Sequence, residues 1–338
     1  MISWIGGFSR LALGASISCH CPARSPRRHA PVNPNDDIHT ADLSDRLGPM
    51  TVKELRQGMR RGSFVIPFLG IHLLAILTTA TEFQAGDLGS TSEHPGILNI
   101  GLLAASGPFW LVVALICAVV MPLGGLTLMG GELEESNHEL LLLTKLTRWQ
   151  VVGGKFLTLW GLCALTFVSL LPYVVVRYLV GGIEPVQELA CSGTVVALAG
   201  MVSAGAIGAS AFPGIGVRIA VLALFFGSMV AACSPPLLFS ANLPHGFPVF
   251  YHINALAAFV CYVLLGLALA RSRVRLVIQS YEIKPSWMVV GLLFFAPAIV
   301  FMTTIMTLGF AGFVGFGVVS LLSLFLDRSP GSIRRAGA

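Results

Sequence analysis

Charged side chains are scarce in this chain. Asp, Glu, Lys and Arg make up 11% of the 338 residues and apolar residues 55%, whereas a soluble domain carries about 25% charged residues. A soluble protein this apolar could not cover its surface with polar groups, which argues against a soluble globular domain. The apolar runs are continuous rather than alternating, which argues against a transmembrane β-barrel. The composition therefore predicts an all-α, polytopic helical membrane protein.

The chain also lacks a nucleotide-binding motif. Its nearest approach to a P-loop, Gly153-Gly154-Lys155-Phe156, has neither the leading glycine nor the hydroxyl residue of G-x-x-x-x-G-K-[ST]. Cys19-His20-Cys21 has no second half-site, so it is a weak zinc signal. We therefore expect a protein that is not itself an enzyme and that holds no cofactor or metal, so any ATP-driven activity would need a separate ATPase subunit. The net charge of +5 does not indicate nucleic-acid binding, because the basic residues follow the expected membrane topology.

Eight apolar segments could cross a bilayer, which takes about 20 residues per helix. Pro108 and Pro122 break the second segment, which predicts kinks or a wet interior, and the fifth segment is expected to end at Pro235-Pro236. Rows of small residues predict close helix packing in the fourth segment (Gly200, Ala204, Gly208) and in the last (Gly309, Gly312, Gly315, Gly317). The expected spans are about 63–82, 102–128, 151–171, 189–212, 217–234, 249–270, 287–306 and 308–326.

Lysine and arginine gather on one side of these spans. Among the short segments that flank the spans, residues 49–62, the stretch 131–150, the turn at Arg218, the linker from Arg271 to Lys284 and the tail 327–338 hold nearly all of them, whereas the opposite loops hold only Arg177. By the positive-inside rule both termini and the 131–150 stretch are expected to be cytoplasmic. Residues 1–48, which are rich in Pro and Arg, are expected to be a disordered tail or to precede the true start.

A short amphipathic helix is predicted over residues 49–62, ahead of the first span. Leu55 and Met59 recur at helical spacing and cations surround them, which is typical of a helix lying at the lipid headgroups. The charged residues expected to matter in this interfacial helix are Lys53, Glu54, Arg56 and Arg60.

A polar stretch, GELEESNHELLLLTKLTRWQVVGGKFL from Gly131 to Leu157, separates the second and third spans. Acidic residues open it, a run of leucines follows, and Arg148-Trp149 stands where the next span begins. This order predicts a helix lying at the membrane surface, with its acids at the helix N-terminus. Such a helix could dock onto a soluble partner.

This stretch resembles the cytoplasmic coupling region of ABC-2 type transporter permeases, the membrane subunits of one class of ABC exporters. A second resemblance is Val52-Lys53-Glu54-Leu55-Arg56-Gln57, which matches the K-E-[LF]-R sequence ahead of the first span in such permeases. Lys145 departs from the family, which usually has Pro there. The residues matching the coupling pattern are Glu139, Leu140 to Leu143, Thr144, Leu146, Thr147, Arg148, Trp149, Val151, Val152, Gly154 and Lys155.

The resemblance implies a permease subunit of an exporter in a bacterial inner membrane. It implies two partners, an ABC ATPase subunit that carries ATP and magnesium, and a second permease subunit in a homo- or heterodimer. The residues expected to contact the ATPase are Glu134, Glu135, His138, Glu139, Leu141, Thr144, Lys145 and Arg148.

Two other functions stay open. An ion-driven secondary transporter would need buried carboxylates, and the expected spans from 102 onward have none away from their ends. An intramembrane hydrolase could use Glu134, Glu135 and His138 for acid–base or metal chemistry, but no second histidine motif accompanies them.

Three ionisable residues within or beside the expected spans are candidates for a role in the membrane. His72, near the middle of the first span, is a candidate for the substrate path or a proton relay, although a neutral histidine bonded across helices is the favoured interpretation. Glu82 and Arg177 lie near outer ends, and we expect both to extend to the lipid headgroups.

Overall fold

The computed structural model describes residues 55–60, 62–85, 96–127, 148–181, 184–241, 248–278 and 287–326. This described part contains helices and turns and no strand. Seven of its helices are long and apolar enough to cross a membrane, and an eighth is apolar but shorter. The chain is thus an all-α, multi-pass membrane protein, which confirms the fold class expected from composition.

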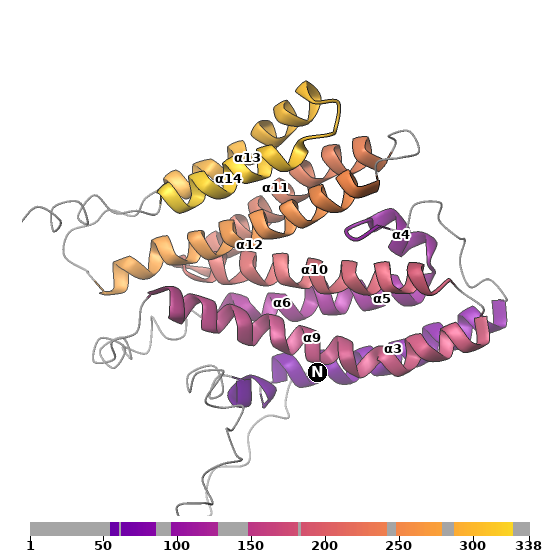
Figure 1. The fold of residues 1–338 in the computed structure, drawn as a ribbon. Helices are drawn as coiled ribbons and strands as arrows, with labels where there is room; N and C mark the ends of the chain where they lie inside the picture. The colour runs from indigo at the N-terminus through magenta and orange to yellow at the C-terminus, as the bar shows by residue number, and fades with distance from the viewer. Residues whose placement is uncertain are drawn as a thin grey trace, which may run out of the picture.

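The helices run roughly along one common direction (Figure 1). Residues 55–59 form a short helix ahead of them. The second apolar stretch is a composite of α-, π- and 3-10-helical turns. In chain order the elements are α3 (Gly62–Ala85), α4 (Ile100–Ala105), α5 (Pro108–Ala114), the π-helix η2 (Leu115–Val120), α6 (Met121–Leu123), the 3-10 turn η3 (Gly124–Thr127), α9 (Arg148–Gly181), α10 (Pro185–Ser210), α11 (Ile215–Ala241), α12 (Pro248–Ile278), α13 (Met288–Met306) and α14 (Gly312–Leu326).

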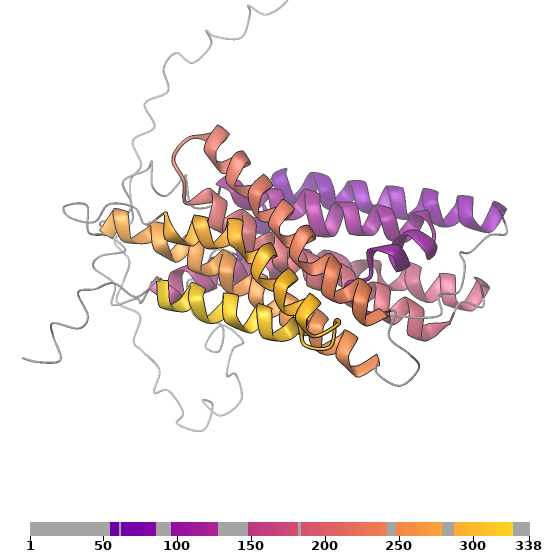
Figure 2. The ribbon, with the colours of Figure 1, turned by 90° about the horizontal axis from the view of Figure 1, so that it is seen from above.

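Helix α10 lies at the centre of the bundle. In its most apolar window 72% of the residues are buried, compared with 17% in α3 at the edge. Figures 1 and 2 show α12 on one side of α10 and α9 on the other, with α13 and α14 beyond α12. One hydrophobic cluster joins α10 to α11–α14 and a second joins it to α3–α5, η2 and α9. Side chains of α10 therefore connect the two halves of the molecule.

The row of small residues in α10 lets α12 approach closely. A Cβ atom added to Gly266 of α12 would lie 2.6 Å from the backbone carbon of Ala204, and one added to Gly208 would lie 2.9 Å from the carbonyl oxygen of Gly266. Without side-chain bulk the two backbones can touch, which favours helix association in lipid. In α14 and the turn that precedes it, Gly309, Gly312 and Gly315 also contact neighbouring helices, whereas Gly317 faces open space.

The second apolar stretch begins later than the sequence predicts. Helix α4 ends at Ala105, and Gly107 with a φ of 103° turns the chain so that Pro108 becomes the first residue of α5. The expected kink at Pro108 is therefore wrong, because proline is well suited to the first helical turn. Near Pro122 the helix does deviate, since the wider turns of η2 directly precede it.

Helix α11 continues through Pro235 and Pro236 to Ala241. The prediction that the fifth span ends at this pair is wrong. Prolines are tolerated inside buried membrane helices because neighbouring helices and hydroxyl side chains satisfy the backbone. The carbonyls that lose their helical donors to the two prolines are those of Ala231 and Ala232, and the helix nonetheless continues past the pair for five more residues.

The C-terminal hairpin differs from two equal spans. Helix α14 has 15 residues, so at 1.5 Å per residue it extends about 22 Å, less than a hydrocarbon core of about 30 Å. Residues 307–311 form a turn, in which Leu308 and Gly309 have positive φ values. The described part of the chain therefore has seven long apolar helices and one short one, where the sequence predicts eight spans.

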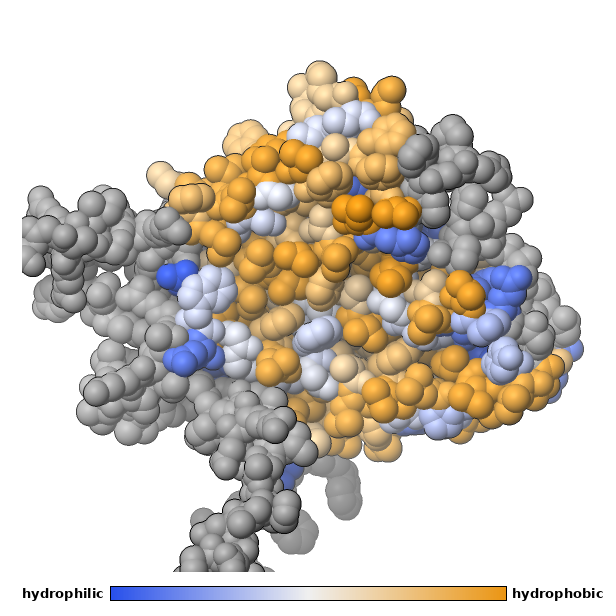
Figure 3. Space-filling model, in the orientation of Figure 1, coloured by the Kyte–Doolittle hydropathy of each residue, from blue (hydrophilic) through white to orange (hydrophobic). Residues whose placement is uncertain are grey.

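The outer surface has the character expected in lipid. Figure 3 shows a largely apolar face, with hydrophilic residues gathered mainly towards its two ends. Large apolar side chains such as Ile66, Leu179 and Met306 are more than 60% exposed. Exposed hydroxyls bond to their own helix, as Thr78 does to the carbonyl of Leu74 at 2.8 Å. A hydroxyl satisfied in this way can face hydrocarbon.

Candidate functional site

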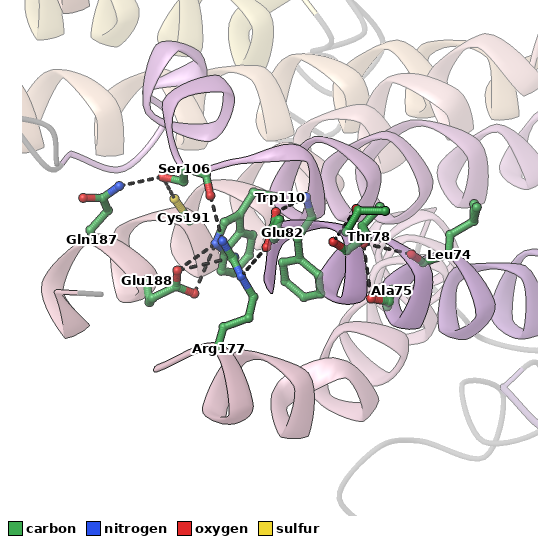
Figure 4. Close-up of polar contacts among 12 residues, drawn as sticks. Leu74, Ala75, Thr78, Glu82, Ser106, Trp110, Arg177, Gln187, Glu188 and Cys191 are labelled. Atoms are coloured by element: carbon green, nitrogen blue, oxygen red, sulfur yellow. Dashed lines mark hydrogen bonds and ion pairs between the residues drawn. The ribbon is translucent and has the colours of Figure 1, made fainter. Parts of the chain in front are cut away.

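Three ionisable side chains meet at one end of the bundle. Glu82 comes from the last turn of α3, Arg177 from the last turns of α9 and Glu188 from the first turn of α10. We call this end, where α3 and α9 finish and α10 begins, the Arg177 end, and the opposite end, where α9 begins, the Trp149 end. Figure 4 shows the three side chains converging between these helices.

Arg177 is the centre of this group. Its Nε lies 3.0 Å from Oε2 of Glu82, and its Nη1 lies 3.4 Å from Oε1 of Glu188. Its Nη2 donates to the carbonyl oxygen of Ser106 at 2.8 Å. The guanidinium carbon lies 4.7 Å from the ring centroid of Phe109, in cation–π geometry. Nη2 is thus hydrogen-bonded to a carbonyl, whereas Nε and Nη1 are held in ion pairs whose geometry is not that of a hydrogen bond.

Both carboxylates have further donors. Glu82 accepts the backbone N–H of Phe109 at 2.8 Å, in the first turn of the composite helix that begins at Pro108. Helix N-termini favour negative charge, so this helix end stabilises the Glu82 carboxylate. The indole N–H of Trp110 faces both oxygens of Glu188, at 3.2 and 3.1 Å. The cluster therefore ties together four chain segments.

A polar shell continues around Ser106. Gln187 donates its amide to the Ser106 hydroxyl at 2.9 Å, and the Cys191 sulfur lies 3.2 Å from the same oxygen. The Ser106 hydroxyl lies 2.7 Å from the carbonyl of Leu102, to which it donates. Gly107 has no side chain to interfere, and a Cβ there would lie 2.7 Å from Oε1 of Glu82. The turn between α4 and α5 is thus shaped to admit the carboxylate.

The cluster is fully withdrawn from solvent. Arg177 is 0% exposed, Glu82 2% and Glu188 4%. The prediction that Glu82 and Arg177 extend to the headgroups is wrong, because each finds its counter-charge inside the protein. With both acids ionised, two carboxylates face one guanidinium, leaving one negative charge in excess. Such a group can hold helices together as a latch, or can take up a proton or a cation.

His72 lies on α3, towards the Trp149 end from Glu82. Its Nε2 is 3.1 Å from the hydroxyl of Ser169 on α9, and its ring lies against Phe68 and Tyr173. The Ser169 hydroxyl also donates to the carbonyl of Thr166 at 2.6 Å, so it accepts from His72. A neutral histidine bonded across two helices explains this arrangement without a proton relay.

The residues expected to contact an ATPase lie almost entirely outside the described residues. These are Glu134, Glu135, His138, Glu139, Leu141, Thr144 and Lys145. Lys53 and Glu54, predicted to lie in the interfacial helix, also fall outside the described residues. Arg148 is the first residue of α9, at the Trp149 end. Arg56 and Arg60 lie in or directly after the short helix 55–59 and are exposed. Lys155 of the resembling pattern is 2% exposed within α9.

The described residues contain no group of three or more His, Cys, Asp or Glu side chains that could hold a metal ion. The five cysteines in this part are all reduced. No protein-family model, no curated protein and no solved structure matches the chain. The site is therefore interpreted from its own geometry.

Sequence reasoning missed Glu188, and with it the cluster. One signal was available: the first, third and fourth long helices each place an ionisable residue near the same end of the bundle. Opposite charges at one depth in neighbouring spans commonly pair. The pairing of Glu82, Arg177 and Glu188 follows from that rule once α3, α9 and α10 are known to touch.

Proposed function

We propose that this chain is the permease subunit of an ATP-driven ABC-2 type exporter in a bacterial inner membrane. The observation that carries the proposal is the sequence pattern from Glu139 to Lys155, which lies directly before and within the start of α9. A separate ATPase subunit would bind the stretch 131–150 on the cytoplasmic side, and a second permease subunit would complete the transporter. Under this proposal the Trp149 end is cytoplasmic and the Arg177 end faces outward.

Helix α9 supplies a physical route for coupling. It runs without interruption from Arg148 to Gly181, about 50 Å at 1.5 Å per residue. One of its ends adjoins the proposed docking stretch, and the other carries Arg177. A tilt of α9 caused by the ATPase would therefore act on the contacts of Arg177 with Glu82 and Glu188. Alternating access needs such a two-state element, whose equilibrium both ends can bias.

The buried cluster would then be the outer latch. In the inward-facing state it holds α3, α9, α10 and the start of α5 together. Opening outward would exchange these ion pairs for water or substrate, a cost that ATP binding would offset. A buried ion pair is weak evidence for a purely stabilising role, because removing both charges from water can cost more than their attraction returns. A switching role therefore fits this cluster, which carries an excess negative charge.

The test is association with the ATPase encoded beside this chain. Co-expression and affinity purification should recover a complex from the wild type, and Glu135→Gln together with Arg148→Glu should reduce recovery by about tenfold, or about 1.4 kcal/mol. Glu184→Gln is the matched control, because Glu184 is exposed at the Arg177 end. Labelling of His138→Cys from the outside of intact cells would rule the proposal out.

The buried carboxylates favour a second candidate, an ion-driven secondary transporter. Glu82 and Glu188 are the kind of group that such a carrier needs, and the sequence alone had not suggested that they were buried. Proteoliposomes containing only this chain and a pH-sensitive dye separate the two functions. Proton flux that is lost in Glu188→Gln, with no ATPase present, would favour the carrier; the absence of flux would favour the permease.

A further inference from the structure

A buried arginine lies beside two aromatic rings that contact each other at the Trp149 end. The guanidinium carbon of Arg273, near the end of α12, is 4.2 Å from the ring centroid of Phe212 and 4.9 Å from that of Trp287. Phe212 belongs to the turn between α10 and α11, and Trp287 precedes α13. Arg273 is 6% exposed. The end of α12, the turn between α10 and α11 and the start of α13 thus meet at this one cation.

This cation has donors without acceptors. Nε and Nη2 of Arg273 are buried and have no hydrogen-bond partner among the described residues. Buried guanidinium N–H groups are nearly always bonded, and an unmet one is costly. The acids that the structure describes, Glu82, Glu184 and Glu188, all lie at the opposite end of the bundle. The cation–π contacts with the two rings stabilise the positive charge of Arg273, but they leave Nε and Nη2 without a hydrogen-bond acceptor among the described residues.

The adjoining helix end calls for negative charge as well. Trp287 is the N-cap of the 19-residue helix α13 and makes no side-chain capping bond. The first backbone bond of this end runs from the N–H of Gly291 to the carbonyl of Trp287, at 2.8 Å, so the N–H groups of Val289 and Val290 have no acceptor within α13. A helix N-terminus repels a cation and attracts an anion. One anion bound between them would accept hydrogen bonds from both the Arg273 guanidinium and the N–H groups of the helix end.

We propose that a phosphate group binds here, between Arg273 and the N-terminus of α13. A tetrahedral phosphate can accept two parallel N–H groups from a guanidinium and further N–H groups from a helix terminus. The site lies at the end of a membrane span, and Trp287 and Met288 beside it are 61% and 65% exposed. Aromatic and apolar residues at that depth contact headgroups and acyl chains. The phosphodiester of a lipid and free phosphate share this chemistry.

The experiment titrates purified, full-length protein in an uncharged maltoside detergent and follows its thermal unfolding. The probes are dihexanoyl phosphatidylglycerol and, separately, inorganic phosphate. We expect a saturable rise in melting temperature with the lipid, and an apparent affinity at least about tenfold weaker in Arg273→Gln. A saturable rise with inorganic phosphate alone, lost in the same variant, would assign the site to a free phosphate instead of a lipid.

Arg271→Gln is the matched control. Arg271 lies on the same helix end, and its guanidinium carbon is 4.9 Å from the Trp149 ring rather than near Trp287, so this variant should keep the wild-type response. An equal loss in both variants, or an unchanged titration in Arg273→Gln, overturns the proposal. If Arg273→Gln does not fold, native mass spectrometry of the wild type decides: no retained phosphatidylglycerol or phosphate overturns the site, and one retained molecule that Arg273→Lys binds more weakly supports it.

Discussion

The Nε atom of Arg177 lies 3.0 Å from Oε2 of Glu82, and neither side chain reaches the surface. The pair joins the last turns of α3 and α9, two helices that otherwise contact each other through apolar side chains and the His72–Ser169 bond. Glu188 adds α10 to the same group. One arginine therefore holds the ends of three membrane helices, and its loss leaves two buried acids facing each other.

Removal of that arginine is expected to destabilise the protein strongly. Arg177→Met leaves the carboxylates of Glu82 and Glu188 buried without a counter-charge, a loss of about 3–5 kcal/mol for a broken buried ion pair. The free energy of unfolding, measured by titrating SDS into mixed micelles, should fall by that amount. Arg177→Met combined with Glu82→Gln should recover part of the loss. Equal stability of the wild type and Arg177→Met would show that the cluster is not closed in the membrane.

The indole of Trp110 is expected to stabilise the folded protein through the hydrogen bond of its N–H as well as through the packing of its ring. Trp110→Phe keeps most of the apolar contact but removes the donor to Glu188. A hydrogen bond to a charged group contributes about 1.5–3 kcal/mol, so unfolding should occur at a correspondingly lower SDS fraction. Trp160→Phe serves as the comparison, because the Trp160 indole donates to a neutral backbone carbonyl, that of Val196, at 3.1 Å. The prediction is contradicted if Trp160→Phe costs as much as Trp110→Phe.

The contact between α10 and α12 should tolerate no added methyl group. Gly266→Ala places a Cβ 2.6 Å from the backbone carbon of Ala204, so the helices must separate, at a cost of about 1–3 kcal/mol for overpacking. Gly291→Ala is the control, because nothing lies within 4 Å of its added Cβ. That change should be neutral or stabilise α13 by up to about 1 kcal/mol, since alanine favours helix more than glycine. Thermal unfolding in detergent would compare the two, and a stable Gly266→Ala protein would argue against this packing.

His72 is expected to contribute little beyond packing. In His72→Phe the aromatic contacts with Phe68 and Tyr173 remain, and only the bond to Ser169 is lost, about 1 kcal/mol or less between membrane helices. Unfolding should therefore change slightly. If the wild type carries proton flux in proteoliposomes, as the second candidate function requires, His72→Phe should carry the same flux. A clear loss of that flux in this variant would restore the proton-relay interpretation.

Part of the candidate site could be inferred from residue identities. Glu82 and Arg177 were recognised as ionisable groups near the ends of spans, but their side chains were placed at the headgroups and Glu188 was overlooked. Hydropathy gives the position of each span along the chain, but it does not give the rotation of each helix about its own axis. It therefore cannot show which face of α3 meets α9. The continuity of α11 through Pro235 and Pro236 could not be predicted for a similar reason, because neighbouring helices decide whether a proline ends a membrane helix.

Hydropathy and charge determined by themselves that this chain is a bundle of membrane helices and where most of them lie. Each residue contributes its transfer free energy to lipid nearly independently of its neighbours, so a window of about 20 residues is enough. Only the tertiary structure decided which charges are buried, that Arg177 is shared by two acids, and that Gly266 touches Ala204. These outcomes depend on contacts between distant segments, and no local pattern of residues contains them.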